Sequence, residues 1–168
     1  MIKAWEAQSK SLIDVQKKGG KLEGEIRELL KWDHGRVIYD PLHKYSIQID
    51  SVFPSKEDPK VITSVTYTEP DTRGHSNENK LQLKVGELAL TKFAYPNCIV
   101  ILILGGSKES WLPYVLEVFD LFFDEVVHVW DKSGLERLKQ IKNNPYSVKI
   151  KHREYWASIS KQFCKYTQ

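Results

Sequence analysis

Cysteine is scarce in this chain, with only Cys98 and Cys164 among 168 residues. Two isolated cysteines exclude a disulfide framework, and they do not have the spacing of a zinc site. Proteins that work without disulfides are typical of reducing compartments. A cytoplasmic location is therefore expected.

Long hydrophobic runs are also missing. The longest apolar stretch is far shorter than the roughly 20 residues that a membrane span needs, and residues 1–6 lack the apolar core of a signal peptide. The net charge of +3 is too small to indicate nucleic acid by itself. The chain contains no internal repeat. Its length and its 41% hydrophobic content predict a single domain at 1–168 with its own core and no membrane partner.

Apolar patterns in the first two thirds of the chain predict three strands around one helix. Residues 44–50 alternate apolar with polar side chains, which is the period of a half-buried strand. Residues 60–68 are rich in β-branched side chains, which favour a second strand. A helical period begins at Glu78. Residues 98–104 are all apolar, which indicates a strand buried on both faces.

The N-terminal part reads as two helices and a short strand. Residues 1–16 have a weak helical pattern, and the Lys-Lys-Gly-Gly sequence at 17–20 is expected to break it. Residues 21–32 form a clearer amphipathic helix that Gly35 is expected to end. Residues 36–39 are then expected to form a strand.

Helices and strands continue to alternate after the apolar run at 98–104. Ser107 is expected to cap a helix, and residues 125–130 are expected to form a strand. A short helix should open at Ser133, and residues 146–152 alternate like a last strand. The polar tail beyond them carries interleaved aromatic residues.

This order predicts an α/β fold with a mixed central β-sheet flanked by helices. A helix connects the strand at 60–68 to the strand at 98–104, so these two strands should be parallel, with a right-handed crossover. The apolar strand at 98–104 should lie at the centre of the sheet.

Three side chains in the predicted strands are candidates for a metal site. Asp50 ends one strand, and Ser64 and Thr66 share a face of the next because strand residues two apart point the same way. A divalent metal needs converging oxygen ligands, usually including carboxylates. A nucleophilic water also needs a base or a cation that lowers its pKa.

The order of elements from residue 21 to residue 104, with Asp50 at the end of the second strand, resembles the PD-(D/E)xK nuclease superfamily. Residues 20–23, Gly-Lys-Leu-Glu, are similar to the first helix of that family, and Asp50 matches its first metal-binding aspartate. The resemblance covers about half of the chain. It implies a restriction-endonuclease-like fold and a Mg²⁺-dependent endodeoxyribonuclease that hydrolyses phosphodiester bonds of DNA. Family analogy also implies a homodimer.

The chain departs from the family motif in the third strand. The family places an acid and a lysine there, whereas this sequence reads Ser64-Val65-Thr66. Some members move the acid onto the following helix, and Glu78 lies 12 positions after Thr66. The resemblance then implies that Asp50 and Glu78 hold Mg²⁺ with Glu23 nearby, while Ser64 and Thr66 line the site.

The lysine of the motif has no obvious replacement. At about 100° per residue, Glu78 should point toward the sheet with the apolar residues of its helix. Lys80, Lys84 and Glu87 should point toward solvent. If the protein cleaves DNA, Lys80 or Lys84 has to supply the cation after a loop rearrangement.

Each candidate also has a structural explanation without catalysis. Asp50 is an ordinary turn former at a strand end. Glu78 is an acid in a first helical turn, which the helix dipole favours. Glu23 can be a solvated helix residue.

The segment 145–168 is a basic, aromatic C-terminal extension with five Lys or Arg residues and one Glu. Basic side chains bind phosphates, and aromatic rings stack on bases. The alternative is a terminal strand and helix that pack their aromatic residues onto the core. The candidate nucleic-acid-binding residues are Lys149, Lys151, Arg153, Lys161 and Lys165.

The sequence thus predicts a restriction-endonuclease-like domain that acts on DNA, most simply as an endonuclease. One alternative is a DNA-binding or assembly protein that kept the fold and lost the catalytic site, and the missing lysine favours it. Another is an unrelated α/β interaction domain.

Overall fold

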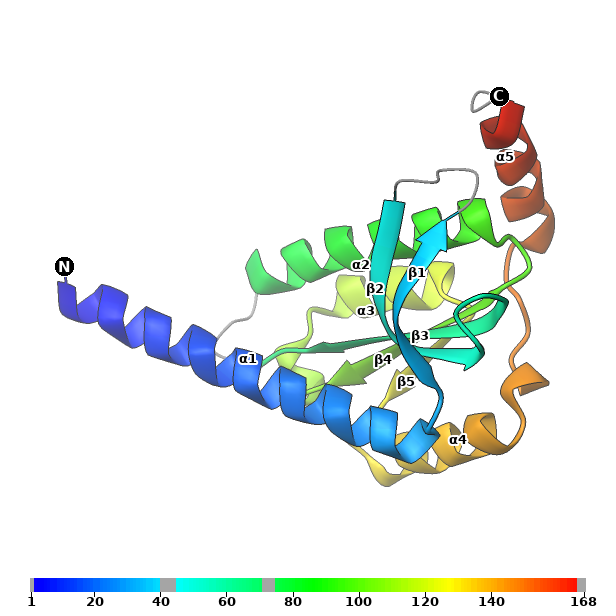
Figure 1. Cartoon of the computed structure of the whole chain (residues 1–168). Coiled ribbons are helices and arrows are strands. Elements are labelled where there is room, and N and C mark those ends of the chain that lie inside the picture. The colour runs from blue at the N-terminus through cyan, green and yellow to red at the C-terminus, as the bar shows by residue number, and fades with distance from the viewer. Residues whose placement is uncertain (1, 40–44, 71–74, 166–168) are drawn as a thin grey trace.

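The computed structural model describes the backbone of residues 2–39, 45–70 and 75–165, and the side chains of residues 16–35, 46–70 and 76–162. It confirms the predicted α/β fold, because a mixed sheet of five strands is flanked by helices (Figure 1). The strands are β1 (Asp33–Tyr39), β2 (Tyr45–Pro54), β3 (Pro59–Tyr67), β4 (Ile99–Gly105) and β5 (Glu125–His128).

The order of strands across the sheet is the same as their order along the chain, β1-β2-β3-β4-β5. The first three strands are antiparallel neighbours, whereas β4 is parallel to both β3 and β5. The prediction that the strands around residues 60–68 and 98–104 are parallel is therefore confirmed. All seven residues of β4 are buried, although β3 rather than β4 is the middle strand.

The helices form two layers, one on each face of the sheet. Even-numbered β4 residues such as Leu102 pack against α2 and α3, and odd-numbered residues such as Ile101 pack against α1 and α4. The fifth helix packs beside α2, where Trp156 contacts Phe93 edge to face at 6.1 Å between ring centroids. The helices are α1 (Ile2–Leu30), α2 (His75–Ala94), α3 (Pro113–Phe122), α4 (Lys132–Asn143) and α5 (Arg153–Lys165).

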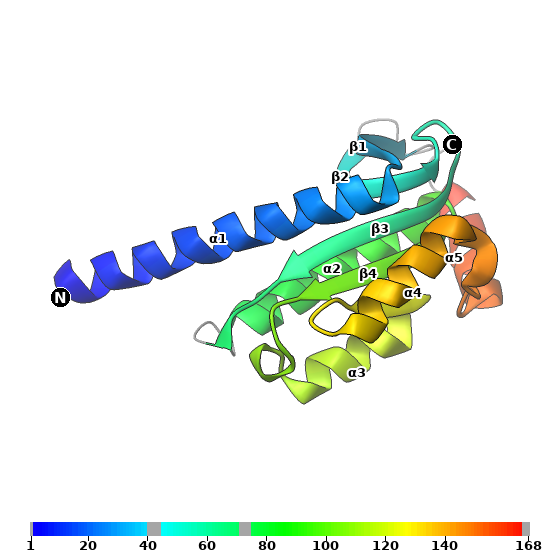
Figure 2. The same ribbon diagram turned by 90° about the horizontal axis from the view of Figure 1, so that it is seen from below.

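The predicted break at residues 17–20 is wrong, because α1 is one continuous helix of 29 residues. Gly19 and Gly20 lower helix propensity by only about 1 kcal/mol each, which tertiary packing of the second half of the helix offsets. The first half extends beyond the sheet, as the two views show (Figures 1 and 2). The helix ends before Lys31, which has the left-handed φ of 56°. Gly35 lies inside β1 and does not end the helix.

Two further predictions near the C-terminal half are corrected. The segment 146–152 is not a strand: Pro145–Ser147 is a 3₁₀ turn. The backbone N–H of Lys151 donates to the carboxylate of Asp124 at 2.7 Å, so it is not available to a strand ladder. Ser107 caps a 3₁₀ turn, and α3 begins only at Pro113, whose fixed φ suits a first helical position.

A buried ion pair joins α2 to the sheet. Lys92 Nζ lies 2.6 Å from Asp124 Oδ2, and both side chains are fully buried. The backbone N–H groups of Val100 and Lys151 also donate to this carboxylate. Among the described residues, no helix is both long and apolar enough to cross a membrane.

Candidate functional site

A β-bulge places Asp50 at the point where two strands separate. The register between β1 and β2 shifts, so that Asp50 and Ser51 together lie opposite His34. Pairing between β2 and β3 extends only as far as Ser51 and Thr63. Beyond this pair, the carboxylate of Asp50 accepts a hydrogen bond of 2.6 Å from the backbone N–H of Val65. This side-chain contact stands where a backbone hydrogen bond between the two strands would otherwise form. Bulges of this kind re-aim a side chain and are common beside active sites.

The Asp50 carboxylate has a perturbed electrostatic environment. Its pKa is raised from 3.8 to about 6: burial is the largest cause and the nearby Glu23 adds to it, whereas the Val65 N–H and Lys84 act in the opposite direction. Glu23 forms an ion pair with Arg27 on the same face of α1. Arg27 Nη2 also lies 4.0 Å from Asp50 Oδ1. The first helix therefore brings one acid and one cation to Asp50.

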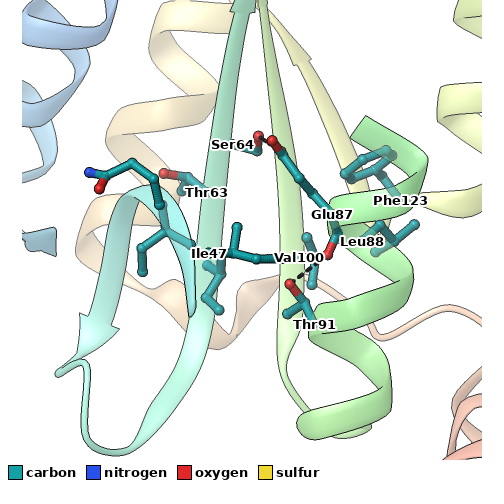
Figure 3. A pocket seen from close by; sticks show the side chains of 11 residues that line it. Ile47, Thr63, Ser64, Glu87, Leu88, Thr91, Val100 and Phe123 are labelled. Atoms are coloured by element: carbon teal, nitrogen blue, oxygen red, sulfur yellow. Dashed lines mark hydrogen bonds between the residues drawn. The ribbon is translucent and has the colours of Figure 1, made fainter. Parts of the chain in front are cut away.

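The second helix contributes a lysine and a glutamate that meet on Ser64. Figure 3 shows Glu87 reaching from this helix to Ser64. Lys84 Nζ donates to Ser64 Oγ at 2.8 Å and lies 2.9 Å from Glu87 Oε2. The Ser64 hydroxyl in turn donates to Glu87 Oε2 at 3.1 Å. Only 11% of the Lys84 side chain is exposed. Burying a charged pair is costly, and the hydrogen bonds that both Lys84 and Glu87 form with Ser64 offset part of that cost.

The cluster on Ser64 and the Asp50 carboxylate belong to one site. Ser64 precedes Val65, whose N–H binds Asp50, and the charge of Lys84 lowers the pKa of Asp50. Beside them a cleft of about 460 Å³ opens between α1 and α2. It is lined by Glu23, Thr66, Lys80 and Lys84, among others. Acid, hydroxyl and amine groups thus face a space that a small anionic group can enter.

The prediction that Glu78 points toward the sheet is wrong. Glu78 is exposed and accepts the hydroxyl of Tyr114 at 3.2 Å. The reverse error affects Lys84 and Glu87, which were expected to face solvent and instead face the sheet. Lys80 is half-buried at the cleft wall, its Nζ donates to Ser76 Oγ at 2.8 Å, and burial lowers its pKa.

The errors have one cause, because the buried face of α2 carries more polar residues than apolar ones. The sequence does mark this face. The buried residues, most of them polar, recur at helical spacing, so at about 100° per residue they lie on one side of the helix. A stripe defined only by Leu81 and Val85 is rotated away from it. The fully or nearly buried residues of the helix are Asn77, Lys84, Leu88, Thr91 and Lys92.

The basic residues of the C-terminal segment do not form one surface. Lys149 and Arg153 line a separate cleft near the start of β3. The amino group of Lys151 donates to the Asp120 carbonyl. Lys161 is exposed on α5, and the side chain of Lys165 lies outside the described residues.

Comparisons of the chain with protein-family models, with curated proteins and with solved structures found no match. Among the described residues, no group of three or more His, Cys, Asp and Glu side chains is arranged to hold a metal ion.

Proposed function

We propose that the chain is a Mg²⁺-dependent endodeoxyribonuclease of the restriction-endonuclease-like type, with its acid and lysine carried by helix α2. One observation carries the proposal. The carboxylate of Asp50, in the bulge where β2 and β3 separate, is close enough to Lys84 for the charge of Lys84 to lower its pKa, and Lys84 is paired with Glu87. The proposal thus replaces Glu78 by Glu87, and Lys84 takes the place of the missing strand lysine.

The donor set suits Mg²⁺. This ion prefers oxygen ligands and usually takes one or two carboxylates, with waters and substrate phosphates completing its shell. Asp50 and Glu87 would hold it, with Glu23 close enough to Asp50 to raise its pKa. A bound Mg²⁺ supplies charge that stabilises a phosphoryl oxygen and lowers the pKa of a water.

The residues of the chain have separate roles in this proposal. Lys84 places a positive charge where negative charge develops on the phosphate during attack. Ser64 and Glu87 hold its amino group in position through bonds of 2.8 and 2.9 Å. Asp50 is ionised, and so able to bind a cation, above the raised pKa of about 6. Thr66 and Lys80 line the cleft that receives the DNA strand.

A second candidate function is supported by the way the charges of the site neutralise one another. Lys84 is already paired with Glu87, and Arg27 is paired with Glu23. A site whose charges are satisfied internally is what a DNA-binding or assembly protein without catalysis would retain. In that case the fold persists, DNA binding persists, and cleavage is absent.

Nicking of supercoiled plasmid in Mg²⁺ separates the two. Asp50→Ala, Lys84→Met and Glu87→Gln should each lower the nicking rate about 10²-fold or more, the usual effect of removing a group that stabilises transition-state charge. Glu78→Gln is the matched control, since Glu78 is an exposed acid of the same helix, and it should keep the parental rate. EDTA should abolish nicking by the parent.

Circular dichroism must show that each variant is folded. Nicking that survives in all three site variants would refute the assignment. DNA binding in a gel shift without nicking by the parent would favour the catalytically inactive alternative. Neither nicking nor binding would point to an unrelated α/β interaction domain.

A further inference from the structure

A second cleft lies at the other end of the central strands. It has a volume of about 530 Å³, which is in the usual range for small-molecule sites. Lys60, the second residue of β3, and Ile99, the first residue of β4, are among the residues that line it. Val65 of the candidate metal site is five residues further along β3, about 16 Å away at 3.3 Å per residue. The two clefts are therefore distinct.

The charges that line this second cleft are largely unneutralised. Lys149 and Arg153 are exposed, and neither forms an ion pair with another described residue. Lys60 is balanced by Asp58, with 2.6 Å between Nζ and Oδ1. Two cations that have no ion-pair partner among the described residues, placed around one concavity, attract a phosphate group, and the fork of an arginine can contact two of its oxygens.

An aromatic ring stands beside these cations. Tyr146 is 60% exposed, although its ring contacts Phe53 edge to face, with 5.9 Å between the ring centroids. Phe53 is in turn packed against Trp32 at 5.5 Å. An exposed ring held in place loses little entropy when a planar group stacks on it. The side-chain amide of Asn97, also at the cleft, can donate to and accept from the edge of a base.

We propose that this cleft binds a nucleotide, with its phosphate between Lys149 and Arg153 and its base on the ring of Tyr146. The shared chemistry is an anionic phosphate joined to a planar heterocycle. A free mononucleotide and the end of a single-stranded nucleic acid both provide it. The site does not depend on the nuclease proposal, because it shares no residue with the cleft between α1 and α2.

Fluorescence anisotropy of a fluorescein-labelled oligonucleotide of eight thymidines tests the proposal, in EDTA so that no cleavage occurs. Lys149→Ala/Arg153→Ala should weaken binding about tenfold or more, the factor expected for one lost charge-assisted hydrogen bond. It should also lower the slope of log affinity against log salt by about 0.7, the value for one lost phosphate contact on a single strand. Tyr146→Leu should weaken binding without changing the slope.

Lys108→Ala/Lys139→Ala is the control with the same loss of charge, since both lysines are exposed and neither lines this cleft. Displacement of the labelled oligonucleotide from the parent protein by unlabelled ATP would identify a mononucleotide site. Displacement by the unlabelled oligonucleotide alone would identify a site for the end of a nucleic acid. The proposal is overturned if neither probe binds, or if the control pair weakens binding as much as the cleft pair. Plasmid nicking by the same variants reports on the other cleft, so failure of one proposal is distinguishable from failure of the other.

Discussion

Replacing Asp50 by Asn should stabilise the protein at neutral pH, because the folded state holds this carboxylate in an unfavourable place. Only 15% of the Asp50 side chain is exposed, and its pKa is raised from 3.8 to about 6. One pKa unit is worth about 1.36 kcal/mol, so the rise corresponds to at most about 3 kcal/mol. Asn keeps an oxygen that can accept the Val65 N–H and removes the charge.

The sign of the pH dependence follows from the same pKa. Because the pKa of Asp50 is higher in the folded than in the unfolded chain, the folded state binds the proton more tightly between about pH 6 and pH 4. Its ionisation therefore destabilises the parent above about pH 6. Asp50→Asn should be more stable than the parent by about 1 to 3 kcal/mol at pH 7.5, and the difference should vanish near pH 4.

Urea unfolding followed by circular dichroism at pH 4, 5, 6 and 7.5 measures this difference, provided that the m value stays constant. Asp120→Asn is the control, since Asp120 is an exposed acid on α3, and it should change stability by less than about 0.5 kcal/mol. A variant less stable than the parent at pH 7.5, or a gain independent of pH, would show that Asp50 is a structural residue. A residue whose replacement raises the stability of the protein is typically one that is kept for function.

Four further predictions concern single residues. The nicking rate should rise with pH through about 6 as Asp50 ionises, and a rate that is flat from pH 5 to 8 would contradict its role as a cation ligand. Lys92→Met should destabilise the protein by about 3 to 5 kcal/mol in urea unfolding, because it leaves the fully buried Asp124 without its cation. Gly24→Ala should raise the thermal midpoint, with a gain of about 0.5 to 1 kcal/mol, because an added Cβ meets nothing within 4 Å in a helix. Gly134→Ala should lower it, because its Cβ would lie 1.7 Å from a backbone carbonyl oxygen.

Most of the sheet could be predicted because its strands carry strong local signals. The apolar run at 98–104 and the β-branched run at 60–68 gave the correct strands and their parallel pairing. The failures occurred where tertiary contacts outweigh local preference. The helix α1 continues through Gly19 and Gly20, and the N–H of Lys151 bonds to a side chain and not to a strand.

The candidate site was only partly predictable. Asp50, Ser64 and Glu23 were identified from spacing and resemblance, and the structure brings all three to one region. Lys84 and Glu87 were placed on the wrong side of their helix, since apolar residues were taken as the markers of the buried face. A helix that buries charged residues beside a cleft breaks this rule, and its buried face is marked only when polar residues at helical spacing are counted together with apolar ones.

The agreement between strand order and chain order has a consequence for how the protein is made. Each strand from β2 to β5 pairs with the strand synthesised just before it. A nascent chain can therefore extend the sheet at one growing edge, and no later strand has to insert between two earlier ones. The Lys92–Asp124 pair is different, because Asp124 acquires its last donor only from Lys151. The full set of donors around the buried Asp124 carboxylate, which holds Lys92 of α2, is therefore complete only after residue 151 has been synthesised.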